Sequence, residues 1–126
     1  MRAVDTNVLV RLMTRDDVGQ VAAAEAFVAK GAWVPHLAVA EATWVLSSVY
    51  DREPEAIATA VEMLLSHEHL TLQDTEAVAA AVALFRQRPK VGFSDCLMVE
   101  VARKAGHIPI GTCDRHLGKI DGAHRL

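Results

Sequence analysis

The sequence predicts an α/β protein with three layers, α/β/α, in which helices cover both faces of a small parallel sheet of four or five strands. Short apolar runs alternate along the chain with longer stretches at helical spacing. This alternation is typical of parallel sheets whose strands are joined by crossover helices. The 126 residues are 52% hydrophobic and 5% aromatic, which is enough apolar material for one core. We therefore expect residues 1–126 to form a single domain.

The bulk composition gives no sign of a membrane protein and only weak evidence against a nucleic-acid enzyme. The net charge is −3, so no overall basic excess indicates nucleic-acid or membrane binding. A cluster of metal-binding acids would itself lower the net charge. Cys96 and Cys113 lack the spacing of a metal motif, which favours reduced thiols in a cytoplasmic protein. We expect neither a signal peptide nor a transmembrane helix.

The elements of the first half follow from apolar spacing and from the residues that interrupt it. A strand at 3–4 runs into Asp5, and a short helix follows to about Thr14. Further helices are expected at 18–30, 36–50 and 55–66, with a strand at 32–35. The interrupting residues are Asp16 or Asp17 as a helix cap, Gly31 as a helix stop, Pro35 at a strand end and Pro54 in a first helical turn.

The second half repeats the pattern. A strand is expected at 70–72, a helix at 75–88, a helix from Asp95 to about Ala105, a strand at 108–110, one helical turn at 115–119 and an edge strand at 123–126. Ser94 is expected to cap the helix that Asp95 opens, and Gly106 is expected to end it.

Four acids occupy positions where carboxylates bind ligands in α/β proteins. Asp5 and Asp114 each follow an apolar strand, and right-handed crossovers bring the carboxyl ends of parallel strands to one edge of the sheet. Asp95 lies in the first turn of a helix. Each of these three acids also has a simpler interpretation, as a helix cap or as a partner of the helix dipole.

Glu41 is the only formally charged residue between Lys30 and Asp51. Its helical neighbours include Leu37 and Trp44, so we expect it on the apolar side of its helix, where a lone carboxylate is costly unless it is paired or bound to a cation. The alternative is a glutamate at the edge of the apolar stripe. If the four acids meet, they cannot all stay ionised without a cation, and hard oxygen ligands suit Mg²⁺ or Mn²⁺.

Four motifs together resemble a PIN domain. They are the opening Met1 to Asn7 with its Asp-Thr-Asn ending, the isolated Glu41, Ser94-Asp95 at a helix start, and Thr112-Cys113-Asp114-Arg115. The length and layout of the chain are most similar to the VapC-type toxins of bacterial and archaeal toxin–antitoxin pairs. The resemblance implies a Mg²⁺- or Mn²⁺-dependent endoribonuclease with an RNA substrate, a homodimer, and inhibition by a cognate antitoxin protein.

The resemblance also implies roles for individual residues. Asp5 and Asp95 would be the principal metal ligands, while Glu41 and Asp114 would complete the catalytic site and position the attacking water. Supporting hydrogen bonds to the acids would come from Asn7, Ser94 and Thr112. Cys113 departs from the family pattern, which commonly has an aromatic residue there. From proximity in sequence, we expect RNA phosphate contacts from Arg86, Arg88, Lys90 and Arg115.

Two other classes of protein compete with this interpretation. A receiver-like phosphoacceptor domain would need an acidic pair after the first strand and a lysine ending a late strand, and both are missing. A non-catalytic α/β interaction module would use all four acids as caps or surface residues, and the position of Glu41 argues most against it.

Overall fold

Six α-helices and five short strands alternate along the chain in a computed structural model that describes residues 1–126. The helices are α1 (Thr6–Thr14), α2 (Val18–Val28), α3 (His36–Ser48), α4 (Pro54–Ser66), α5 (Thr75–Gln87) and α6 (Phe93–Ala105). The strands are β1 (Arg2–Ala3), β2 (Ala32–Val34), β3 (Leu70–Leu72), β4 (Ile110–Thr112) and β5 (Ala123–Arg125). Two short 3-10 helices are η1 (Pro89–Val91) and η2 (Leu117–Lys119). The predicted α/β class is confirmed.

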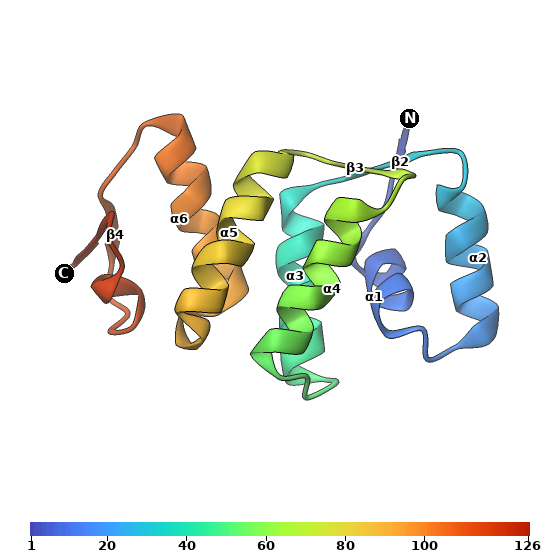
Figure 1. Ribbon diagram of the computed structural model, residues 1–126, viewed down its shortest axis with the longest axis horizontal. Helices are drawn as coiled ribbons and strands as arrows, with labels where there is room; N and C mark the ends of the chain where they lie inside the picture. Colours follow the sequence, from blue (N-terminus) through green and yellow to red (C-terminus); the bar gives the residue numbers. More distant parts are fainter.

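The strands pair in parallel, as predicted, but they form two sheets. One sheet has the order β1-β2-β3, and the other consists of β4 and β5. Figure 1 shows β4 at the opposite end of the molecule from β2 and β3. Because strands of two or three residues form few ladder hydrogen bonds, helix packing decides how the sheets are arranged. One edge of β1 and one edge of β4 have no strand partner.

Most element boundaries lie close to their predicted positions, with two exceptions near the candidate site. β4 begins at Ile110 rather than Ile108, because Pro109 has no N–H to donate to a ladder. The prediction that Ser94 caps α6 is wrong, since α6 begins at Phe93 and its N-cap is Gly92. Gly92 has φ +81°, a conformation that glycine adopts readily and that sequence patterns do not reveal.

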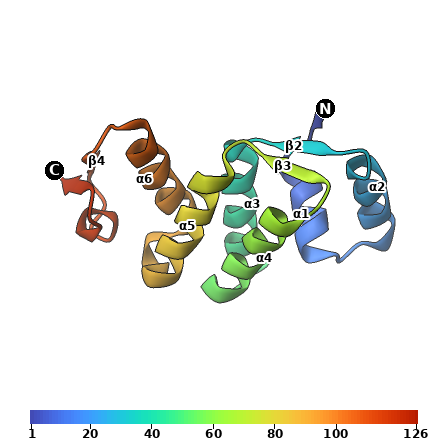
Figure 2. The ribbon, with the colours of Figure 1, turned by 45° about the horizontal axis from the view of Figure 1, so that its top comes forward.

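Helix α3 lies at the centre of the helical packing. It packs against α1, α4 and α6, and Figure 2 shows it between α1 and α6. Its buried face consists of Ala38, Val39, Ala42, Thr43 and Leu46, which belong, Thr43 apart, to a core that draws on all six helices. No helix combines the length and apolar character needed to cross a membrane.

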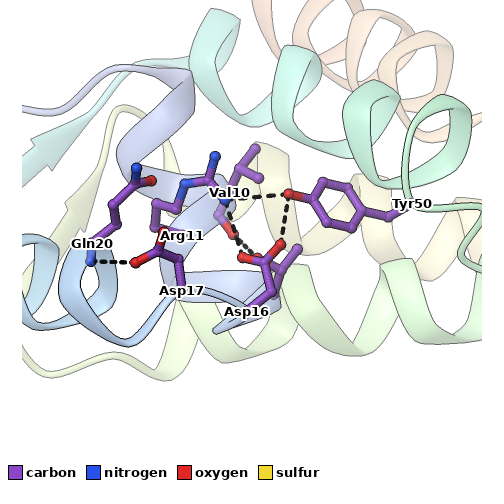
Figure 3. Close-up of polar contacts among 7 residues, drawn as sticks. Val10, Arg11, Asp16, Asp17, Gln20 and Tyr50 are labelled. Atoms are coloured by element: carbon purple, nitrogen blue, oxygen red, sulfur yellow. Dashed lines mark hydrogen bonds and ion pairs between the residues drawn. The ribbon is translucent and has the colours of Figure 1, made fainter.

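A polar cluster attaches the turn between α1 and α2 to the end of α3 (Figure 3). The Asp16 carboxylate accepts hydrogen bonds from Arg11 at 3.0 Å, from Tyr50 at 3.0 Å and from the Thr14 hydroxyl at 2.9 Å. Asp16 was one of two possible caps of α2, and the cap is Asp17, which accepts from the Gln20 N–H. The two adjacent aspartates therefore have different roles: Asp17 caps α2, and Asp16 links the turn before α2 to Tyr50.

Candidate active site

Asp5 lies two residues beyond β1 and is the N-cap of α1. One oxygen of its carboxylate accepts a hydrogen bond from the Val8 N–H at 3.1 Å. The other oxygen has no protein partner, and the residue is exposed. The capping interpretation is thus confirmed, and it leaves one carboxylate oxygen free to bind a ligand at the carboxyl end of a strand.

Glu41 is linked to this position by a residue that the sequence analysis did not single out. The Thr6 hydroxyl, next in the chain to Asp5, donates a hydrogen bond of 3.0 Å to Glu41 Oε2. This contact joins the first turn of α1 to the second turn of α3. The only signal in the sequence was the hydroxyl beside Asp5, and its partner 35 residues away is set by the packing of α1 on α3.

The expectation that Glu41 is enclosed by apolar side chains is wrong. Glu41 is exposed, and so are its helical neighbours Leu37 and Trp44, at 68% and 64%. An apolar stripe on a helix need not be the face that packs, and α3 buries its small residues instead. Glu41 is therefore held near Asp5 by Thr6 rather than forced to find a cation by burial.

Asp95 and Asp114 form a second pair of acids. Asp95 is half-buried in the first turn of α6. Burial raises the pKa of Asp95, and the charge of the nearby Asp114 carboxylate raises it further. Both effects disfavour the ionised form, so this pair is a place where a cation would be bound favourably.

Local hydrogen bonds set the position of Asp114. The Leu117 N–H donates to Asp114 Oδ2 at 2.7 Å, so the carboxylate is held against the first residue of η2. The Asp114 N–H donates to the Thr112 hydroxyl at 3.0 Å. The Thr112 side chain thus holds the backbone of Asp114 rather than its carboxylate. Asn7 and Ser94, the other two residues expected to support the acids, form no side-chain hydrogen bond with any of them.

The structure places the four acids in two groups. Asp5 lies next to Thr6, which binds Glu41 of α3, and Asp95 lies near Asp114. α1, with Asp5, packs on one side of α3, and α6, with Asp95, packs on another (Figure 2). Trp44, one turn beyond Glu41, lines a cavity of about 150 Å³ together with Ser94, the neighbour of Asp95. No three histidine, cysteine or acidic side chains lie close enough to one another to hold a metal.

The Asp95–Asp114 pair nevertheless fits a hard divalent cation. Mg²⁺ in proteins is commonly bound by one or two carboxylates and keeps several waters, which substrate phosphates can replace. Cys96 is a poor alternative ligand, because burial raises its pKa to about 12. The two carboxylates of the pair supply oxygen donors, which suit Mg²⁺ or Mn²⁺.

The basic residues expected to contact RNA differ in their availability. Arg86 forms ion pairs with Glu55, at 3.2 Å, and with Glu62. Its charge is therefore used between α4 and α5, and the structure does not favour it as an RNA ligand. Arg88, Lys90 and Arg115 are exposed and form no ion pair.

These features define an α/β domain in which carboxylates that can bind a metal lie after a strand, at Asp5, and in the first turn of a helix, at Asp95. The family model for the PIN domain matches residues 2–123, and the chain belongs to the PIN domain family. PIN domains are generally nucleases, and these nucleases usually use divalent metals. No curated protein and no solved structure matches the chain.

Proposed function

We propose that this protein is a Mg²⁺- or Mn²⁺-dependent endoribonuclease that hydrolyses phosphodiester bonds in RNA. The main observation in support is the Asp95–Asp114 pair, in which burial and like charge raise the pKa of Asp95. A site of this kind favours a hard cation, and the chain belongs to a family of nucleases.

Each acid has a role in this reaction. Asp95 and Asp5 are the principal metal ligands, and Asp114 and Glu41 complete the site and orient the attacking water. A bound divalent ion lowers the pKa of that water and neutralises charge on the phosphate. Thr6 holds the Glu41 carboxylate in place, and Thr112 holds the turn that presents Asp114.

All four acids can contribute to cleavage at one phosphate only if Asp5 and Glu41 come closer to Asp95 and Asp114. β1 and β4 each have an unpaired edge, and both sheets are parallel. A closed state in which β4 pairs in parallel with β1 would bring the two sheets together. Because Asp5 follows β1 and Asp114 follows β4, parallel pairing would place both acids at the same end of one sheet.

We further propose that the protein is the toxin of a type II toxin–antitoxin pair, acting in the cytoplasm as a homodimer that a cognate antitoxin protein inhibits. The support is the resemblance of the four motifs to VapC-type toxins. Exposed apolar side chains offer surface for a protein partner, and on α3 and α6 they are Leu37, Trp44, Met98 and Val101.

The test is cleavage of a mixed RNA pool by the purified protein with Mg²⁺, with Mn²⁺ and with EDTA. We expect metal-dependent cleavage that is lost in both Asp5→Asn and Asp95→Asn. Asp51→Asn is the matched control, because Asp51 is an exposed aspartate in the turn after α3 with no ion pair. Absence of both cleavage and Mg²⁺ binding would contradict the nuclease function.

The second candidate is a non-catalytic interaction module. The observation in its favour is that no three acids lie within reach of one cation. It predicts partner binding without metal-dependent RNA cleavage. A receiver-like function has less support, because Asp74, the acid after β3, caps α5 and forms an ion pair of 2.9 Å with Lys104.

A further inference from the structure

We propose that a basic hollow beside the Asp95–Asp114 pair binds a phosphate of the RNA strand next to the phosphate that is cleaved. This inference rests on the proposed function and adds a substrate-binding subsite to it. The hollow has a volume of about 290 Å³, and the side chains of Arg88, Lys90, His116 and Lys119 line it.

The charge of this hollow is not compensated within the protein. Arg88, Lys90 and Lys119 form no ion pair, and no acid lines the hollow. Five other basic residues have acidic partners, namely Arg11, Arg15, Arg86, Arg103 and Lys104. What distinguishes the hollow is that three cations without such partners line the same small volume. Three cations gathered without a counter-charge repel one another, so an anion in the hollow is bound favourably.

The hollow is tied to the acid pair by the chain itself. η1 carries Lys90 and ends directly before Gly92, the N-cap of the helix that presents Asp95. On the other side, His116 comes two residues after Asp114, and two residues span at most about 7 Å. A strand with its scissile phosphate at the acids therefore passes the hollow with a neighbouring phosphate.

Both walls of the hollow are anchored in the protein. Val91 in η1 and Leu117 in η2 are buried at 7% and 4% exposure, so each short helix is held by the core. η2 is also held by Asp114, whose carboxylate accepts the Leu117 N–H at 2.7 Å. This hydrogen bond from η2 to Asp114 thus also positions His116 and Lys119 relative to the acid pair.

The chemistry of the hollow fits a phosphate rather than a base. Lysine acts as a point charge toward phosphate, and arginine can bind phosphate oxygens in a bidentate manner. No phenylalanine, tyrosine or tryptophan lines the hollow, so it lacks the stacking platform that single-stranded bases use. The expected contribution is positioning of the strand without reading its sequence.

The test measures binding of a short single-stranded RNA to the full-length protein in EDTA, where cleavage is blocked, over a range of salt concentrations. We expect the Lys90→Gln and Lys119→Gln variants to bind more weakly and their combination to bind most weakly. Each lost phosphate contact lowers the slope of log affinity against log salt by about 0.7. Lys119→Arg, which keeps the positive charge, should show the wild-type slope of log affinity against log salt.

Lys30→Gln is the matched control, because Lys30 is an exposed lysine without an ion pair after α2, and it should leave the slope unchanged. An unchanged slope in the double variant, or no RNA binding by the wild type in EDTA, would overturn the subsite. Cleavage with Mg²⁺ reports separately on the proposed function. Wild-type cleavage with an unaffected double variant refutes the hollow alone. Charge-dependent RNA binding with neither cleavage nor Mg²⁺ binding contradicts the nuclease function and leaves the hollow as a phosphate-binding site.

Discussion

The folded protein disfavours the ionised form of Asp95, whereas the carboxylate of Asp5 caps a helix. The pKa of Asp95 is raised by burial and by Asp114. Asp5 instead accepts the Val8 N–H at the start of α1, where a carboxylate is favourable. Substitution of these two acids should therefore abolish cleavage in both cases but change the stability of the metal-free protein in different ways.

Asp95→Asn should leave the melting temperature in EDTA at pH 7 unchanged or higher, because the amide removes both the buried charge and its repulsion by Asp114. The pKa of Asp95 is raised in the folded state, so the carboxyl group destabilises the protein progressively as pH rises from about 4, its unfolded value, through the raised folded value. The gain in the variant should accordingly be larger at pH 7 than at pH 4. A lower melting temperature at pH 7 than in the wild type would contradict this account.

Asp5→Ala should lower the free energy of unfolding in EDTA by about 1 kcal/mol, because alanine cannot accept the Val8 N–H at the N-cap. Asp5→Asn should keep most of that free energy, since asparagine is an equally good cap. Urea unfolding of the two variants side by side measures the difference. Equal stabilities would mean that the cap contributes nothing and that the position matters only for activity.

At the scale of elements, hydrogen bonds and ion pairs link helices to one another in addition to their apolar packing. The pair α1–α2 is joined to α3 through Asp16, and α4 is joined to α5 through Arg86. The hydrogen bonds from Thr14 and Tyr50 lower the pKa of Asp16. The same cluster raises the pKa of Arg11, first through Tyr50. This cluster holds the turn before α2 at the end of α3 (Figure 3).

Asp16→Asn should lower the melting temperature at pH 7, because an amide accepts weaker hydrogen bonds from Tyr50 and Arg11 than a carboxylate does. A carboxyl group with a lowered folded pKa contributes stability that is fully present above its unfolded value near pH 4 and is lost as pH falls through the folded value. The difference between the wild type and the variant should therefore shrink below about pH 4. A difference that is independent of pH down to strong acid would show that the charge of Asp16 does not matter.

At the scale of the whole molecule, Asp5 follows a strand of one sheet and Asp114 follows a strand of the other. Figure 1 shows α5 and α6 between β4 and the strands β2 and β3. The separation of the two sheets leaves β1 and β4 each with an open edge, and unpaired strand edges readily accept another strand. A cation shared by Asp5 and Asp95 would stabilise an arrangement in which these edges approach, because it binds that arrangement more tightly than the open one.

Addition of Mg²⁺ or Mn²⁺ should therefore slow amide hydrogen exchange in the segments of β1 and β4, residues 2–4 and 110–112. The slowing should be reversed by EDTA and absent in Asp95→Asn. Ca²⁺-free buffer with the same ionic strength of a monovalent salt is the control for screening. Protection confined to β4 would indicate that the cation binds at the Asp95–Asp114 pair without bringing the sheets together.

The sequence by itself determined the order of strands and helices, their parallel pairing, and the position of each acid within its element. The helices and strands depend on interactions within a few residues, such as apolar periodicity and the glycine stop at Gly106. Their alternation along the chain implies parallel pairing. Asp5 and Asp114 could be placed after strands from the same local patterns.

Only the tertiary structure decided which acids meet and which charges remain free. The Thr6–Glu41 hydrogen bond, the proximity of Asp95 to Asp114 and the ion pairs that occupy Arg86 all join residues from different elements. The division of the strands into two sheets is also of this kind. Such contacts depend on helix packing summed over the whole core, which no local pattern encodes.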